Sequence, residues 1–329
     1  MSIRVPTCSK CARSSILHQA YSGQDLCRAH LLESVRKRVA RELRAQVRIP
    51  DHHDPTNPFR ILVAVSGGKD SSVLLERMVD LLGPRQDVEL LAACVDEGIE
   101  GYRTPSLESA RALCARLGVP FHTVTYPELG FREMDEVVRR LPMIGKEHSE
   151  ASGLAPCSFC GVFRRRGLQY LARSTGAHLL AFGHNLDDMA QTVMMNLQKG
   201  DVRRTLRMAP HTNREVPGLI PRIVPLRFIP EQEIMAYAKE IGLEIHHDEC
   251  PHAEGALRWR HRSRIAQMES EVPGTRHGLV RFVDGLRAMI EDTPSGPDAV
   301  PCPQCGSMGS GTSVCRACEM RGWITQDDR

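Results

Sequence analysis

Short apolar runs alternate with longer amphipathic segments through the middle of the chain. Apolar runs of this length are typical of buried strands, and apolar residues spaced three or four apart are typical of helices. The strands predicted in this way are 61–65, 88–95, 121–124, 178–182 and 223–226. The predicted helices are 70–82, 105–117, 161–174, 186–198 and 230–241. Because strands and helices alternate, we predict an α/β fold with a doubly wound parallel sheet, in which ligands lie at the carboxyl ends of the strands.

Further segments flank this alternating region. Residues 31–47 are predicted to form an amphipathic helix with a basic face, and residues 263–290 a helical stretch broken near Pro273 and Gly274. Residues 50–58 and 292–301 are rich in Pro, Gly, Asp and Asn, which is typical of linkers.

Composition narrows the class of protein. The 329 residues are 41% hydrophobic and 25% charged, as in ordinary soluble globular proteins. We expect no membrane span, because no apolar run approaches 18 residues. The first ten residues lack the apolar core of a signal peptide, so we expect a cytoplasmic protein. The net charge is only +3, yet basic residues gather in runs that favour a polyanionic partner. These runs are Arg36, Lys37, Arg38, Arg41 and Arg44; Arg164, Arg165 and Arg166; Arg203, Arg204 and Arg207; and Arg258, Arg260, Arg262 and Arg264.

The first predicted strand leads directly into a glycine-containing loop, and a helix follows at once. Consecutive small residues let backbone N–H groups approach an anion closely, and the N-terminus of the helix adds partial positive charge. The spacing is neither that of a Walker A loop nor that of a dinucleotide fingerprint. The candidate phosphate-binding residues are Ser66, Gly67, Gly68, Lys69, Asp70 and Ser71.

Two other strand ends are expected on the same edge of the sheet. The second predicted strand ends at Val95, and Gly183 to Asp188 follow the fourth. Carboxylates at the start of a helix often serve only as caps, so a structural role for Asp188 stays open beside a role in positioning Mg²⁺ or substrate. The candidate nucleotide-binding residues outside the loop are Ala64, Cys94, Val95, Arg164, Gly183 and Asp188.

Ten of the twelve cysteines fall into three groups, which in a chain of this kind favours metal binding over disulfides. Cys94 and Cys114 stand apart, and we expect them to be buried. Two groups, near the ends of the chain, each supply four ligands as two close pairs, which predicts closed tetrahedral zinc sites of structural type. Their members are Cys8, Cys11, Cys27 and His30, and Cys302, Cys305, Cys315 and Cys318.

The third group has three cysteines and no evident fourth. Cys157 and Cys160 form a Cys-x-x-Cys pair, and Cys250 lies far along the chain. Three interpretations are open: a zinc site completed by His246, His247 or His252, a redox dithiol, or an iron–sulfur cluster that leaves one iron available for exogenous sulfide.

Several segments together resemble the cytosolic tRNA 2-thiolation family, whose members carry a pyrophosphatase-type loop, called the PP-loop. The resemblance covers nearly the whole chain and is carried by residues 66–71, 95–103, 157–166 and 183–195. It implies an ATP-consuming tRNA sulfurtransferase that adenylates the C2 oxygen of a uridine and replaces it with sulfur. Lys69 and Arg164 would stabilise phosphate charge, with Mg²⁺ near Asp188.

The same resemblance implies that Cys157, Cys160 and Cys250 hold a 4Fe-4S cluster, while an older alternative makes the paired cysteines persulfide carriers. It implies tRNA as the partner, free sulfide or a ubiquitin-like carrier protein as the sulfur donor, and possible homodimers. Segments 95–103, 157–166 and 187–196 are similar to the wobble-uridine (position 34) group, whereas Cys27-x-x-His30 is more similar to the group that thiolates uridine 54 in the T-loop. A non-catalytic zinc-ribbon RNA-binding adaptor is the alternative from another class.

These expectations divide the chain into five parts. They are an N-terminal zinc module (1–32), a basic helix and linker (33–58), a PP-loop ATP-binding catalytic domain (59–250), a helical region expected to contact tRNA (251–295), and a C-terminal zinc module (296–329).

Overall fold

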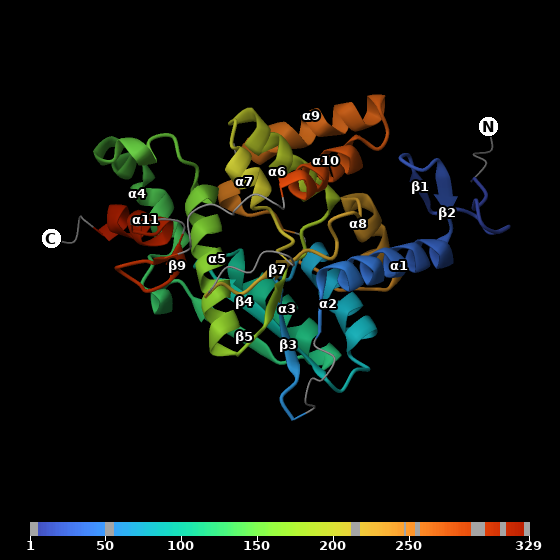
Figure 1. The fold of residues 1–329 in the computed structure, drawn as a ribbon, viewed down its shortest axis with the longest axis horizontal. Helices are drawn as coiled ribbons and strands as arrows, with labels where there is room; N and C mark the ends of the chain where they lie inside the picture. The colour runs from blue at the N-terminus through green and yellow to red at the C-terminus, as the bar shows by residue number, and fades with distance from the viewer. Residues whose placement is uncertain are drawn as a thin grey trace.

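The structure is a computed structural model that describes residues 6–49, 56–211, 218–246, 248–253, 257–290, 300–309 and 314–325. At its centre is a parallel sheet with the strand order β5-β4-β3-β6-β7 (Figure 1). The strands are β3 (Phe59–Ala64), β4 (Val88–Asp96), β5 (Phe121–Thr125), β6 (Leu179–Ala181) and β7 (Arg222–Ile223). The predicted doubly wound α/β fold is therefore confirmed.

The strand order fixes where a ligand can enter. The chain runs from β3 outward to β4 and β5, then returns to the other side of β3 for β6 and β7. The loops after β3 and β6 consequently leave the sheet in opposite directions and open a crevice at its carboxyl edge, the usual ligand site of such sheets. Both loops were singled out in the sequence.

Helices cover both faces of the sheet. One face packs against α1 (Arg28–Gln46), α2 (Lys69–Leu82), α3 (Arg103–Leu117) and α8 (Glu231–Glu240). The other face packs against α4 (Met134–Glu147), α5 (Pro156–Ser174) and α11 (Arg316–Thr325). Alternate strand residues serve the two cores: Ile61 and Val63 lie in the first core and Leu62 in the second, as the twofold alternation of a strand requires.

A further group of helices lies beyond the carboxyl edge of the sheet and runs along the top of Figure 1. It consists of α6 (Leu186–Gln198), α7 (Val202–Leu206), α9 (Leu257–Glu271) and α10 (Thr275–Ile290). The predicted break near Pro273 and Gly274 is confirmed as the turn between α9 and α10, where Gly274 has a φ of 98°.

Small elements complete the fold. Two hairpins lie near the chain ends, formed by β1 (Leu17–Gln19) with β2 (Gln24–Leu26) and by β8 (Val300–Pro301) with β9 (Met308–Gly309). The 3₁₀ turns are η1 (Pro127–Leu129), η2 (Ser149–Ala151) and η3 (Pro251–Ala253). In Figure 1 the two hairpins stand on opposite sides of the central sheet.

Several boundaries differ from those predicted. Helix α4 was not predicted, because Pro142 interrupts its sequence pattern although the helix continues through it. Helix α5 begins at Pro156 rather than at residue 161, so Cys157 and Cys160 lie in its first turns. The strand predicted at 223–226 is only Arg222–Ile223, because the chain turns immediately afterwards.

Parts of the predicted linkers, residues 50–55 and 292–299, lie outside the described residues. The division of the chain into five parts stays a prediction. Within the described ranges, none of the helices combines the length and the apolar character that crossing a membrane requires.

Candidate functional site

The predicted phosphate loop joins β3 to the N-terminus of α2, where no described side chain caps the helix. The hydroxyl of Ser71 donates to the carbonyl of Gly68 (3.0 Å) and accepts from the backbone N–H of Ser66 (3.0 Å). These bonds close the loop on itself. The first N–H groups of α2 therefore face outward without side-chain partners, which is the arrangement that binds an anion.

Glycine is required at two positions around this loop. Gly67 has a φ of 87°, and a Cβ there would lie 2.1 Å from the carbonyl oxygen of Ser106. A Cβ on Gly183 would lie 3.0 Å from the backbone of Asp70 and Ser71. The loop after β6 can therefore pack directly on the phosphate loop, as predicted from the strand order.

A side-chain bridge fixes these two loops together. Asn185 donates through Nδ2 to Oδ1 of Asp70 (2.9 Å) and caps α6 by accepting from the N–H of Asp188 (3.0 Å). The carboxylate of Asp188 in turn accepts from the backbone N–H of Asn185 (3.2 Å), which completes a capping box. Asp188 thus has the structural role left open by its sequence position, while its other oxygen bonds to Arg258 (2.8 Å).

A cavity of about 260 Å³ opens between these loops and α9. Four of the predicted site residues line it: Lys69, Asp70, Asp188 and Cys250. Asn185 and Asp187, which also line it, belong to the segment 183–188 that the sequence places at this edge. The other lining residues were not predicted as site residues, and they are Gln191, Glu231, Glu249, Ala253, Arg258 and Arg262. A sequence signal existed for Asn185, since Asn before a helix is a common cap. No sequence signal identified Glu231, which follows Pro230 at the start of α8.

The cavity holds a dense set of opposite charges. Nζ of Lys69 lies 3.0 Å from Asp70 and 2.8 Å from Glu231. Burial alone would lower the pKa of Lys69, but these two carboxylates outweigh burial and raise it. Burial raises the pKa of Asp70, although Lys69 and Asn185 act against that change. Lys69 therefore stays cationic, with Asp70 beside it in the cavity.

The three cysteines of the third group converge beside this cavity. Cys157 and Cys160 lie near the start of α5, and the Sγ of Cys157 is 3.9 Å from the backbone oxygen of His252, two residues after Cys250. The hydroxyl of Tyr126 donates to the backbone oxygen of Cys160 (3.0 Å). Cys157 is exposed, and the other two cysteines are partly buried.

The spacing of this group differs from that of a zinc site. A zinc ion with four sulfur ligands holds them about 3.8 Å apart, because Zn–S bonds are about 2.3 Å long. The sulfur atoms of Cys157, Cys160 and Cys250 do not all lie within 4.8 Å of one another. Among the histidines considered as a fourth ligand, His252 bonds to Asp135 (2.6 Å), His246 packs on the ring of Tyr102, and His247 lies outside the described residues.

Behind the cysteines lies a buried charge network that sequence reasoning missed. Glu97 is 2% exposed and pairs with Arg103 (2.8 Å) and with Arg164 (3.6 Å). Arg103 also donates to Cys94 and to the backbone oxygen of Val95. Burial raises the pKa of Cys94 to about 11, so this thiol is neutral. Ala64, Cys94 and Val95 lie in the sheet at or near the ends of β3 and β4, and none of the three lines the cavity as described.

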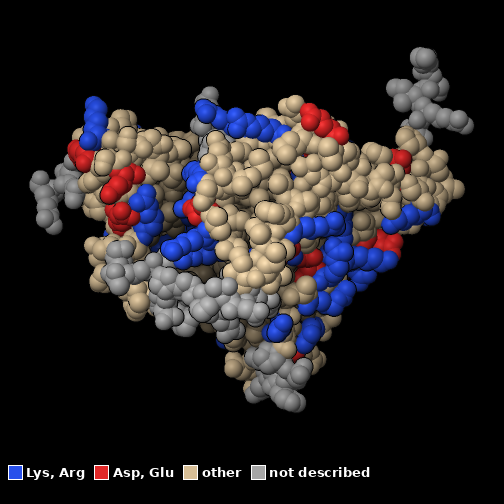
Figure 2. All heavy atoms as spheres, turned by 45° about the horizontal axis from the view of Figure 1, so that its top comes forward, with Lys and Arg blue, Asp and Glu red and all other residues tan. Residues whose placement is uncertain are grey.

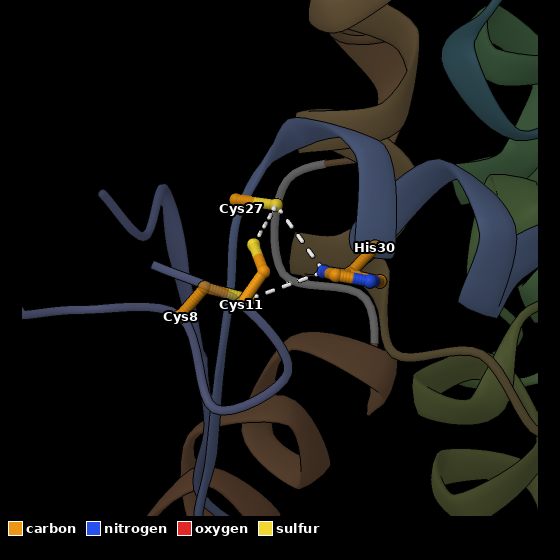
Figure 3. A group of neighbouring side chains, drawn as sticks. All are labelled: Cys8, Cys11, Cys27 and His30. Carbon is orange, nitrogen blue, oxygen red and sulfur yellow. Dashed lines mark hydrogen bonds between the residues drawn. The ribbon is translucent and has the colours of Figure 1, made fainter. Parts of the chain in front are cut away.

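The N-terminal ligand set is assembled as predicted. Figure 3 shows Cys8, Cys11, Cys27 and His30 turned toward one another, the first two from a loop and the others at the start of α1. Sγ of Cys11 and Sγ of Cys27 are 3.8 Å apart, and Nδ1 of His30 lies 3.3 Å from Sγ of Cys8 and 3.4 Å from Sγ of Cys27. Backbone N–H groups point at Cys8 and lower its pKa to about 6, against the effect of burial. The distances are those that a tetrahedral zinc ion needs between its ligand atoms.

The C-terminal set has the same design. Sγ of Cys305 lies 3.7 Å from Sγ of Cys315, and Cys302 accepts from the N–H of Cys315 (3.3 Å). All four ligand atoms lie within 4.8 Å of one another. Cys302 and Cys318 are buried, so the set is shielded from water on one side.

Basic side chains gather on the surface near these sites. Figure 2 shows a band of Lys and Arg on the right of that face, the side on which α1 lies in Figure 1. On α1, the side chains of Arg36, Lys37 and Arg41 are 61%, 74% and 63% exposed. Such exposed cations suit the phosphate backbone of a nucleic acid.

Known proteins match this chain at both the sequence and the structure level. A family model described as a PP-loop domain matches residues 36–140. The tRNA 2-thiolation protein NcsA of Haloferax volcanii is 37% identical over 322 residues, which are 95% of this chain and 97% of that protein. Cytoplasmic tRNA 2-thiolation protein 1 of Bos taurus is 34% identical over 318 residues, or 96% of this chain and 87% of that protein.

A solved structure agrees with these relatives. The U34-tRNA thiolase NcsA from Methanococcus maripaludis, described with its 4Fe-4S cluster, superposes with a TM-score of 0.76 and 29% identity. The match covers 97% of this chain and 96% of that one. Because these similarities extend over the phosphate loop, the cysteine groups and both ends of the chain, the protein belongs to the tRNA 2-thiolation family.

Proposed function

We propose that this protein is an ATP-dependent tRNA sulfurtransferase that converts a uridine to 2-thiouridine. One observation carries the proposal: the phosphate loop residues Lys69 and Asp70, the carboxylate of Asp188 and the thiol of Cys250 line the same cavity. The groups for activating an oxygen with ATP and for delivering sulfur are thus within reach of one bound nucleotide base.

The first step uses the phosphate loop. ATP would lie with its phosphates on the N-terminus of α2, and the carboxylates of Asp70 and Asp188 would hold a Mg²⁺ ion that offsets the phosphate charge. The C2 oxygen of uridine bonds to the α-phosphorus, and the bond to the β-phosphate oxygen breaks with release of pyrophosphate. Lys69 stabilises the charge that develops on the phosphates. Arg164 of α5 is the second cation that we assign to this role. The C2 oxygen then leaves readily as part of AMP.

The second step places sulfur at C2. A sulfur nucleophile adds to this carbon and expels AMP. Cys157, Cys160 and Cys250 fit a cluster better than a single zinc ion, because Cys157 contacts the chain beside Cys250 while the three sulfur atoms are spread beyond zinc spacing. A 4Fe-4S cluster held by these three cysteines would supply an iron without a protein ligand, to which sulfide can bind. The persulfide alternative uses the same cysteines without iron.

The two terminal ligand sets have a different role. Each offers four protein ligands, which leave zinc no open position for catalysis. Metal binding there would fold segments that are too short to bury a core of their own. We therefore assign zinc to both sets as a structural ion.

The proposed substrate is the wobble uridine of tRNA. Support comes from the solved relative, whose description names U34, and from the wobble-type segments 95–103 and 157–166. The Cys27-x-x-His30 pair favours the T-loop group, which keeps uridine 54 as the second candidate. In either case the base must leave its stack to reach the cavity, and basic side chains on α1 would hold the tRNA backbone.

Free sulfide and a ubiquitin-like carrier protein are the two candidate sulfur donors.

Pyrophosphate release with bulk tRNA tests the enzymatic assignment. The wild type should release pyrophosphate and AMP only when ATP and tRNA are both present, and Lys69→Ala should abolish release. The matched control is Lys199→Ala, which removes an exposed lysine at the end of α6. Tight tRNA binding without any pyrophosphate release would instead support a non-catalytic adaptor.

The position of the target is tested in a deletion strain. Nucleosides and tRNA fragments are analysed by mass spectrometry with and without the gene. Loss of thiolation in anticodon loops supports the wobble assignment. Loss confined to the T-loop overturns it in favour of uridine 54.

A further inference from the structure

Helix α9 reaches into the ATP cavity with two arginines. Nη1 of Arg258 lies 2.8 Å from Oδ1 of Asp188, and Nη2 of Arg262 lies 3.1 Å from Oε2 of Glu231. Their side chains are 43% and 50% exposed, so each guanidinium sits at the mouth of the cavity and not in a core. The sequence had suggested only that basic residues here contact an RNA backbone.

The position of Glu231 shows what kind of group these arginines can hold. One oxygen of its carboxylate accepts from Lys69 (2.8 Å), and the other accepts from Arg262 (3.1 Å). A single anionic group therefore bridges a residue of the phosphate loop and a residue of α9. A phosphate presents the same pair of charged oxygens, and the planar fork of a guanidinium matches it in two-point contacts.

The lining of the cavity carries more negative than positive charge. The described lining carries three cations, Lys69, Arg258 and Arg262, against five carboxylates. A divalent cation would offset this negative charge for a bound triphosphate. If Asp188 holds Mg²⁺, its carboxylate would no longer pair with Arg258, and the guanidinium of Arg258 could bond to a phosphate oxygen.

We propose that Arg258 and Arg262 bind the pyrophosphate end of ATP, on the side of the cavity opposite the phosphate loop. This inference rests on the proposed ATP site. When the C2 oxygen of uridine bonds to the α-phosphorus, the electron pair of the broken bond passes to pyrophosphate. The two guanidiniums stabilise that charge, and Glu231 returns to Lys69 and Arg262 after pyrophosphate leaves.

Pyrophosphate binding without tRNA tests the proposal. Titration calorimetry measures the affinity of the full, metal-loaded chain for magnesium pyrophosphate and for AMP. Arg262→Gln and Arg258→Gln should each weaken pyrophosphate binding by about tenfold to a hundredfold, the worth of a charge-assisted hydrogen bond, and leave AMP binding unchanged. The matched control is Arg260→Gln, an exposed arginine of α9 that does not line the described cavity and should leave pyrophosphate affinity as in the wild type.

A second variant gives a result of opposite sign. Glu231→Gln removes the competing charge and keeps a carbonyl oxygen for Lys69, so pyrophosphate should bind several-fold more tightly. A merely structural role of Glu231 would weaken binding. Thermal unfolding of each variant confirms that it is folded.

Three outcomes would overturn the inference. Wild-type pyrophosphate affinity in both arginine variants contradicts it outright. A loss of tRNA affinity with unchanged pyrophosphate affinity would assign these arginines to the RNA backbone. Weaker pyrophosphate binding in Glu231→Gln would show that the carboxylate supports the site and does not compete for it.

Failure of thiolation with every tRNA, alongside normal arginine-dependent pyrophosphate binding, would instead contradict the proposed function alone.

Discussion

At the residue scale, the conformation of the phosphate loop requires a residue without a Cβ atom at position 67. Gly67 combines a left-handed backbone conformation with the carbonyl of Ser106 where its Cβ would be. Gly68, its neighbour, has a φ of −81°, and a Cβ there would meet nothing closer than 3.7 Å. Two adjacent glycines therefore have different reasons for being glycine.

Gly67→Ala should lower the free energy of unfolding by about 1–3 kcal/mol from backbone strain alone, and the clash adds to this cost. Because the loop must shift, ATP-dependent pyrophosphate release should fall to background. Urea denaturation and the release assay measure the two effects. Gly68→Ala is the control for folding, and it should unfold within about 1 kcal/mol of the wild type. Equal stability of the two variants would contradict the steric argument.

His211 makes stability depend on pH. Burial and the charge of Arg222, 3.1 Å away, lower the pKa of His211 from 6.5 to about 4. The unfolded chain therefore binds a proton between these values that the folded chain does not, and stability falls as pH drops through this window. His211→Gln should flatten this part of the profile. Chemical denaturation of both proteins across the window measures the difference, and parallel profiles would exclude His211 as the cause.

Single residues were predictable where function is carried by a short motif. Ser66 to Ser71 and the two terminal ligand sets stand in local patterns whose chemistry dictates their residue types. The roles of Glu231 and Glu97 were not predictable, although Glu97 lies in the segment 95–103. Glu231 pairs with Lys69 and Glu97 with Arg164, and both partners are distant in sequence. Only the folded chain brings such pairs together.

At the element scale, α8 connects the N-terminal module to the ATP site. Its first turn places Glu231 on Lys69, and two residues later the fully buried Glu233 pairs with Arg38 of α1. Gln19 and Tyr21, from the β1–β2 hairpin, donate to the same carboxylate at 3.0 and 2.8 Å. Helix α8 therefore contacts both the N-terminal hairpin and the phosphate loop at the carboxyl edge of the sheet.

Glu233→Ala should destabilise the protein by about 3–5 kcal/mol, because it leaves the guanidinium of Arg38 buried without its partner. The matched control is Glu33→Ala, which removes the exposed pair between Glu33 and Lys37 on α1 and should leave the denaturation midpoint close to that of the wild type. Both values come from denaturant unfolding of the zinc-loaded protein. A similar small cost for both substitutions would show that the buried network is not stabilising.

Elements with a clear hydrophobic period were predicted nearly to the residue, as α6 was. Those governed by tertiary packing were not. Helix α4 continues through Pro142 because its apolar residues Met134, Val137 and Ile144 are buried in the second core. The start of α5 was also missed, although Pro156 occupies the first helical position, where proline is favoured.

At the scale of the whole molecule, the three candidate metal-binding groups are held by separate parts of the fold. The terminal sets lie on opposite sides of the sheet, and the three-cysteine site lies near its carboxyl edge (Figure 1). Their metals should therefore be lost independently.

Cys250→Ala should remove iron and acid-labile sulfide from anaerobically purified protein and leave both zinc ions in place. Metal analysis by mass spectrometry measures both contents. Cys114→Ala is the control, since Cys114 is buried between α3 and the sheet, away from every ligand set. Full activity of iron-free, aerobically purified protein would favour the persulfide route over the cluster.

The last described helix of the chain forms part of the wall behind the cysteine site. Trp323 of α11 packs on Phe159, which lies between Cys157 and Cys160, with ring centroids 6.2 Å apart, and Arg140 of α4 donates to the backbone oxygen of Ile324 (2.8 Å). Residues 316–325 leave the ribosome long after residues 157–160. A nascent chain that lacks them has Phe159 without the ring of Trp323 and α5 without its contacts to α11. We therefore expect the cysteine site to be loaded only after translation of α11, so cluster insertion is a post-translational event and not a co-translational one.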